Sequence, residues 1–248
     1  MNNDNVVLRV HSLLDSAYKI GGSGSLNSTS YRKTWAKVFE IDEDDTPSLL
    51  SSLSLLLESI RTSRSIIESH PRLNTEKNIR FLNKIELGIF SINLKNGTME
   101  NFYNHINKET LTAFGYIGEA ISLLNEFSTN ELDSEQINSL ISEIEELAHL
   151  FSVSTLPEKL KLIAINKLNL IRDALTQYAI TGPNGIEEVL EQTLGSIFLN
   201  ADSFQTESSS PEVKGFFKVI DKLIKLLGLG NSAGQFLEHI NKLLPPKE

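Results

Sequence analysis

The 248-residue chain contains no cysteine. Disulfide bonds, cysteine-ligated zinc, iron–sulfur clusters and thiol catalysis are therefore excluded, while the redox compartment is left open. Glycine and proline are scarce, at 14 and 7 residues, which argues against collagen-like repeats, low-complexity linkers and a turn-rich sandwich. No apolar run reaches the roughly 18 residues that span a bilayer, and the N-terminus lacks a basic signal-peptide region. We expect a cytoplasmic protein.

The remaining composition is that of a folded helical protein. Hydrophobic residues make up 40% of the chain and charged residues 22%, which is enough to build a core. Apolar residues recur at helical spacing almost throughout, and no β-branched run alternates with polar residues. The sequence therefore predicts an all-α bundle of about ten helices without a sheet. A break near Ser128 to Leu132 suggests two halves, 1–130 and 131–248, with a single domain as the alternative.

Local signals predict where the helices begin and end. Thr46 is the expected N-cap of a helix that runs to about Ser69, and Asp133 with Gln136 forms a capping-box pair. Residues 200–210 are expected to be a polar loop, because they are nearly all polar. The other helices are expected at residues 4–20, 31–40, 74–96, 133–151, 156–178, 186–197 and 210–227, with a last one from residue 231. Thr98 is expected to cap a shorter piece, after which the chain stays helical to about residue 127.

Charge is distributed unevenly along the chain. The net charge is −9, with −2 in residues 1–130, −9 in residues 131–210 and +2 in residues 211–248. A surface this acidic repels phosphate backbones, so we do not expect a general nucleic-acid-binding protein.

One pair of residues points to an enzyme. Arg64 precedes His70 by six residues near the end of a predicted helix, and this spacing resembles the ribonuclease motif of HEPN domains, which are also helical bundles. The resemblance implies a metal-independent ribonuclease in which His70 acts as a general base and Arg64 stabilises the phosphorane. The alternative is a surface arginine and a histidine that ends a helix.

A second pattern concerns metals. Glu146 and His149 match the Glu-x-x-His unit of di-iron bundles. Such a site needs a second copy of the unit, which the sequence lacks, and His149 flanks the apolar stripe of its helix. We therefore expect no metal site, and no cofactor motif is present either.

The helix at residues 211–228 is the strongest interaction candidate. Four lysines fall within about 80° of its circumference, and apolar residues fill the opposite half-turn. This pattern suits a membrane-surface helix, a helix laid in a partner's groove, or a terminal helix packed on its own acidic bundle. The candidate surface comprises Lys214, Lys218, Lys222, Lys225, Phe216, Phe217, Ile220, Leu223, Ile224 and Leu227.

The segment from Glu158 to Asn200 resembles a recurrent segment of uncharacterised bacterial all-helical proteins. The shared pattern is a helix ending in an aromatic residue, here Tyr178, then a Gly-Pro turn and an acidic helix closing in Leu-Asn. The resemblance implies a bacterial source and a helical fold, and it supplies no catalytic residue.

These observations favour a non-enzymatic protein-interaction module that binds another protein or a second copy of itself. The resemblance favours an accessory component of a bacterial stress, phage-defence or toxin–antitoxin system. The ribonuclease and the membrane-surface protein remain the alternatives.

Overall fold

The computed structural model describes residues 5–21, 29–90, 92–124 and 132–228. Within these residues the regular structure consists of twelve α-helices and no strand, which confirms the all-α prediction. An isolated bridge between Ser30 and Thr98 is the single β-type pairing in the described part of the chain. The chain divides into two compact units, residues 1–127 and residues 128–248.

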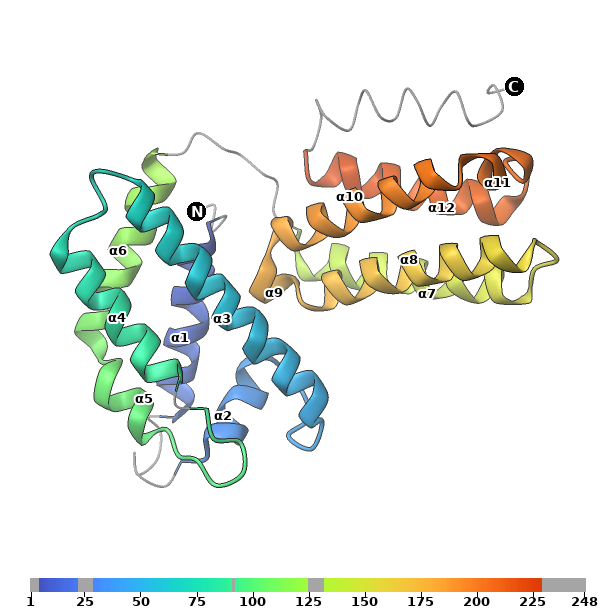
Figure 1. Cartoon of the computed structure of the whole chain (residues 1–248). Coiled ribbons are helices and arrows are strands. Elements are labelled where there is room, and N and C mark those ends of the chain that lie inside the picture. Colours follow the sequence, from blue (N-terminus) through green and yellow to red (C-terminus); the bar gives the residue numbers. More distant parts are fainter. Residues whose placement is uncertain (1–4, 22–28, 91, 125–131, 229–248) are drawn as a thin grey trace. The chain divides into compact units, whose positions relative to one another are not determined.

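Unit 1 is built from six helices. In chain order they are α1 (Val6–Gly21), α2 (Tyr31–Val38), α3 (Thr46–Ser69), α4 (Glu76–Phe90), α5 (Glu100–His105) and α6 (Lys108–Leu124), as Figure 1 shows. Helix α1 packs against α2, α3 and α6, while α4 packs against α3, α5 and α6. The buried side chains include Trp35, which is the only tryptophan in the sequence and is fully buried.

Two glycines allow α1 and α6 to approach closely. A Cβ atom on Gly118 would lie 2.6 Å from Cδ2 of Leu8, and one on Gly115 would lie 3.1 Å from Nε2 of His11. Asn5 reinforces the contact, since its side-chain amide donates to the carbonyl of Gly118 at 2.8 Å. Helix α6 can therefore carry only very small residues on this face.

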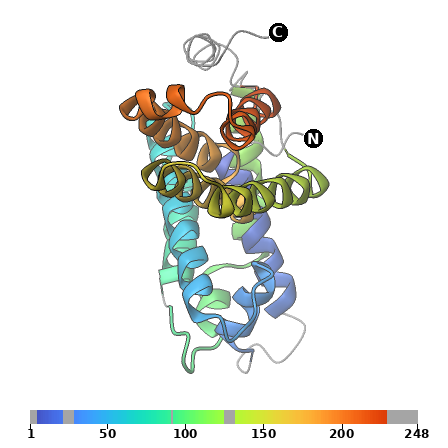
Figure 2. The ribbon, with the colours of Figure 1, turned by 90° about the vertical axis from the view of Figure 1, so that its right-hand side faces the viewer.

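Unit 2 places four long helices in two layers. Helices α7 (Ser134–Val153) and α8 (Glu158–Thr176) form one layer, and α10 (Pro183–Leu199) and α12 (Pro211–Leu226) form the other, as Figures 1 and 2 show. Helices α8 and α10 pack together across the layers, as do α7 and α12. The short helices α9 (Tyr178–Thr181) and α11 (Ala201–Thr206) join them.

Several helix ends follow the predicted capping chemistry. The capping box of α7 forms, since Asp133 accepts from the backbone N–H of Gln136 at 2.8 Å and the Gln136 side chain accepts from Asp133 at 3.0 Å. Ser210 caps α12 by accepting from the N–H of Val213 at 3.2 Å.

The N-cap of α3 differs from the prediction. Asp45, rather than Thr46, is the cap, and its side chain accepts hydrogen bonds from the backbone N–H and the hydroxyl of Ser48. These bonds lower the pKa of the Asp45 carboxyl group. Thr46 is instead the first residue of α3, and its hydroxyl accepts a hydrogen bond from Arg32 at 2.6 Å.

Three other expectations need correction. Helix α4 ends at Phe90 rather than at residue 96, because residues 93–97 form a turn that the side chain of Asn93 stabilises. The shorter piece expected after residue 97 is α5, whose N-cap is Met99 rather than Thr98, and the Asn107 side chain then accepts from the N–H of Thr110 at the start of α6. The expected polar loop at residues 200–210 contains α11, which buried Phe204 anchors. The helix expected from residue 231 lies outside the described residues.

Candidate functional site

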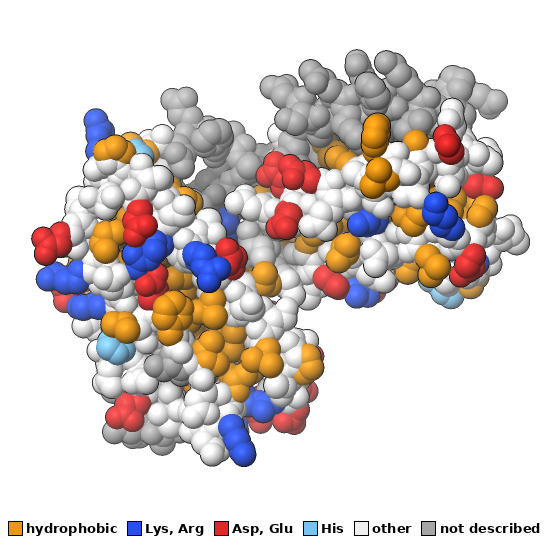
Figure 3. All heavy atoms as spheres, viewed as in Figure 1, with side chains coloured by type: hydrophobic (Ala, Val, Ile, Leu, Met, Phe, Trp, Pro, Cys, Tyr) orange, Lys and Arg blue, Asp and Glu red, His pale blue; other side chains and the backbone are white. Residues whose placement is uncertain are grey.

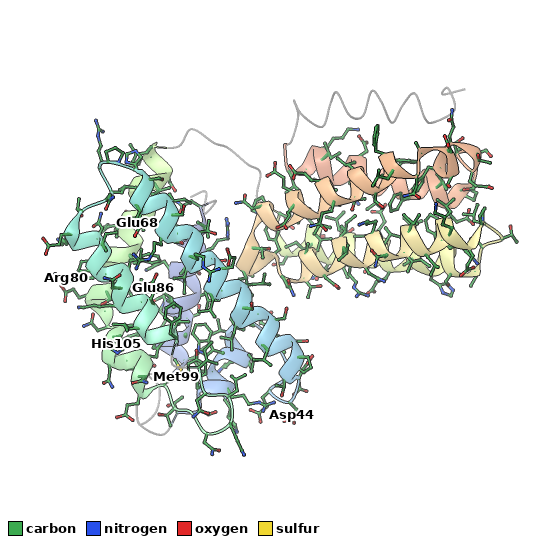
Figure 4. All side chains as sticks on the ribbon, viewed as in Figure 1. Asp44, Glu68, Arg80, Glu86, Met99 and His105 are labelled. Carbon is green, nitrogen blue, oxygen red and sulfur yellow. The ribbon has the colours of Figure 1, made fainter. Side chains whose placement is uncertain are left out.

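Arg64 ties α3 to α4. Its Nε and Nη2 atoms donate to the two carboxylate oxygens of Glu86 at 2.6 and 2.8 Å, and Nη1 donates to Glu68 at 2.8 Å. Nη2 also donates to Asn83 at 2.6 Å. The hydrogen bonds that Arg64 donates to Glu86, followed by the one that it donates to Glu68, raise the pKa of Arg64 above its usual value. Figure 4 labels both glutamates. The guanidinium is thus bound to two carboxylates that would repel a phosphate.

His70 lies at the end of α3 and does not join Arg64. It is the C-cap residue, and its Nδ1 atom accepts a hydrogen bond from the backbone N–H of Arg72 at 3.3 Å. Within the described residues no hydrogen bond connects the His70 and Arg64 side chains. The structure gives each residue of the ribonuclease hypothesis a structural partner and does not assemble them into one site.

The apolar face of α12 is buried inside unit 2. The six apolar residues proposed as a partner or membrane surface are each at most 5% exposed: Phe216, Phe217, Ile220, Leu223, Ile224 and Leu227. The Phe216 ring stacks on Phe204 at 5.7 Å between centroids and packs edge-on against Phe151 at 6.1 Å. These side chains form core, because the acidic bundle itself supplies the apolar partner that the helix needs. They are not on the surface that the sequence analysis expected.

The lysines of α12 have two different environments. Lys222 forms an ion pair with Glu143 of α7 at 2.6 Å, so this lysine contacts the acidic part of its own unit. Lys225 pairs with Asp221 within α12 at 2.6 Å. Lys214 and Lys218 are exposed. The α12 surface therefore offers isolated cations without an accompanying apolar patch.

The described residues show no cluster of three or more potential ligands for a metal ion. Glu146 and His149 are both exposed on α7. In the same described part of the chain, every helix is too short or too polar to cross a membrane.

Several large apolar side chains are exposed on unit 1. Leu50 on α3 is 50% exposed, Leu87 and Phe90 on α4 are 54% and 60% exposed, and Ile92 just beyond α4 is 36% exposed. Figure 3 shows hydrophobic side chains gathered in a run on this face of the unit. We call these four residues the α3–α4 surface. Its three helical members, Leu50, Leu87 and Phe90, lie off the buried stripes of their helices, which is the sequence signal that could have identified them.

A groove runs between α4 and α6 on the same unit. It encloses about 680 Å³, and its floor consists mainly of apolar residues: Leu73, Phe81, Ala113, Ile117 and Ala120. Tyr116 stands beside the floor and is 66% exposed. Lys77 on α4 and Lys108 on α6 line opposite sides, together with Glu109, Asn78 and Thr112. No sequence motif marks this groove, because its residues come from two helices that are separated along the chain.

No family model, curated protein or solved structure matches this chain.

Proposed function

We propose that the chain is a non-enzymatic protein-interaction module whose α3–α4 surface binds the same surface of a second copy. The observation that carries the proposal is the exposure of large apolar side chains on adjacent helices of one unit. Leu87 and Phe90 are each more than half exposed, although α4 has a separate buried stripe that fills the core. Gathered apolar residues of this kind are typical of protein-binding surfaces, whereas single exposed ones are not.

Charges at the two ends of this face favour a second copy as the partner. The segment before α3 carries four exposed acids in succession, residues 42–45. Arg80 and Lys84 lie on α4 with Leu87 within about 60° of the helix circumference, at 100° per residue. Figure 4 places Asp44 and Arg80 at opposite ends of unit 1. A two-fold axis through the α3–α4 surface would bring the acidic end of one copy to the basic end of the other.

A dimer of this kind would also give a partner to the unpaired cations of α4. Arg80 and Lys84 lie over the ring of Phe81, each 5.6 Å from its centroid, and neither forms an ion pair within the described residues. Their charges are therefore available to an acidic surface across an interface. Such attraction should weaken as salt increases, because the Debye length falls to about 3 Å at 1 M ionic strength.

Sedimentation equilibrium of the full chain tests this proposal. We expect a concentration-dependent dimer whose dissociation constant rises at least about tenfold in Leu87→Asp and in Phe90→Asp. Leu162→Asp is the matched control, because Leu162 is 61% exposed on α8 of unit 2 and lies outside the surface. A protein that stays monomeric throughout the accessible concentration range, or a dimer that the control disrupts equally, refutes the proposal.

A further inference from the structure

The groove between α4 and α6 has the features of a binding site for a helix. Its floor follows α6 at positions 113, 117 and 120, which share one face of that helix. Two of these positions are alanine, and their short side chains create the depression. The exposed Tyr116 forms a wall beside them. From Lys108 to Ala120 the groove extends about 18 Å at 1.5 Å per residue. This length suits about three turns of a helix, which would place side chains at i, i+4 and i+7 on the floor.

The charges around the groove indicate which kind of partner it would bind. Lys77 and Lys108 lie on its two sides, and within the described residues neither lies in an ion pair. Glu109 is the single acid among the lining residues. In a chain of net charge −9, this groove is thus bordered by cations.

We propose that the α4–α6 groove binds an acidic amphipathic helix of a partner protein. The apolar side of that helix would lie on Phe81, Ile117 and the two alanines, and its carboxylates would face Lys77 and Lys108. Because the lysines lie on opposite sides, they would hold a helix with acidic residues along both flanks of its apolar stripe. The polar side chains of Asn78 and Thr112 can add hydrogen bonds at the edges.

The site differs from the cationic helix of unit 2. There, Lys222 is paired with Glu143 and the apolar residues are in the core, so charge and apolar area are not available together. In the groove, unpaired lysines lie in one depression with the exposed Tyr116 and the partly exposed Ala113 and Ala120, above the buried Phe81 and Ile117. This combination supplies both the attraction and the buried area that helix binding needs.

A matched pair of synthetic peptides tests the proposal. Each has about 14 residues, enough to span roughly 18 Å, with leucine at i, i+4 and i+7 spacing. One peptide carries glutamate at its polar positions and the other carries lysine. Fluorescence anisotropy with the full chain should show that the glutamate peptide binds at least about tenfold more tightly than the lysine peptide, and that salt weakens this binding.

Variants of the chain locate the binding. The double variant Lys77→Glu and Lys108→Glu should weaken binding of the glutamate peptide at least about tenfold. The double variant Lys37→Glu and Lys95→Glu is the control, because both positions are exposed elsewhere on unit 1, and its dissociation constant should stay within about twofold of that of the unchanged protein. Tyr116→Ala should weaken binding too, and the 66% exposure of Tyr116 means that this change removes little packing.

Filling the floor separates groove binding from simple charge attraction. Ala113→Phe should abolish binding, provided that Trp35 fluorescence and far-UV circular dichroism show an intact fold. Equal binding of the two peptides, or binding that both the Lys77/Lys108 and the Ala113 variants leave unchanged, overturns the proposal. None of these positions belongs to the α3–α4 surface, so a monomeric protein that binds the glutamate peptide would refute self-association and support the groove.

Discussion

The close contact between α1 and α6 gives a quantitative test of the fold of unit 1. In Gly118→Ala the new Cβ would lie 2.6 Å from Cδ2, 2.8 Å from Cγ and 3.3 Å from the backbone nitrogen of Leu8. Leu8 cannot retreat freely, because its N–H donates to Asn5 at 3.0 Å and Asn5 is bound to Gly118. Overpacking of this kind costs about 1–3 kcal/mol.

The same substitution also has a favourable contribution. Alanine is about 1 kcal/mol better than glycine in a helix interior. The net expectation for Gly118→Ala is therefore a destabilisation of about 0–2 kcal/mol. Gly195 in α10 supplies the matched control, because nothing lies within 4 Å of its added Cβ. Gly195→Ala should stabilise its unit by about 0.5–1 kcal/mol, so the two variants should differ by about 1–3 kcal/mol.

Urea denaturation distinguishes the two variants. Trp35 is the only tryptophan and is fully buried in unit 1, so its fluorescence reports the unfolding of that unit. Far-UV circular dichroism reports the helices of both units. Gly118→Ala should lower the fluorescence midpoint, and Gly195→Ala should raise the midpoint of the circular dichroism transition that belongs to unit 2. If Gly118→Ala stabilises the protein as much as Gly195→Ala does, α1 does not pack on α6 as described.

Three further outcomes follow from the packing and charges. Glu86→Gln should destabilise unit 1 by about 1–2 kcal/mol in urea denaturation, because it weakens a largely buried ion pair with Arg64. Glu58→Gln is the control: its ion pair with Arg61 is exposed, and the change should cost at most about 0.5 kcal/mol. Phe216→Ala should lower the free energy of unfolding, followed by circular dichroism, by about 3–5 kcal/mol. Phe198→Ala, at a 70% exposed site, should lower it by under about 1 kcal/mol. Equal losses would contradict the burial of the apolar face of α12. Burial raises the pKa of Tyr103 to about 12. The free energy of unfolding should therefore fall as the pH rises from about 10 towards 12. Tyr103→Phe should remove the corresponding step in an absorbance titration at alkaline pH.

Helix content and several caps could be predicted because they depend on neighbouring residues. The capping box of Asp133 and Gln136 closes within one helical turn, and the same holds for Ser210 and Val213. The cap of α3 could not be chosen in this way. Asp45 and Thr46 are both suitable acceptors, and only the structure shows that the helix begins at Thr46, which leaves Asp45 as the cap.

Burial of individual apolar residues was less predictable. Phe204 stands alone in a polar stretch, yet its ring stacks on Phe216 at 5.7 Å and holds α11 in place. Leu87 and Phe90 belong to a helix with a clear apolar stripe, yet both lie outside that stripe and are exposed. A helical wheel gives the direction of each side chain but not which directions other helices cover, and that information comes only from the tertiary arrangement.

The two candidate cationic surfaces differ in what accompanies their charges. On α12 the stripe of lysines was the strongest signal in the sequence, but Lys222 is neutralised by Glu143 of the same unit and the adjoining apolar face is core. Lys77 and Lys108 form no stripe, since 31 positions separate them along the chain, and yet they border one groove. A lysine attracts a partner strongly only where no internal carboxylate already satisfies it and where apolar area is accessible beside it. By that criterion the α4–α6 groove, rather than α12, is the place to look for a bound acidic helix.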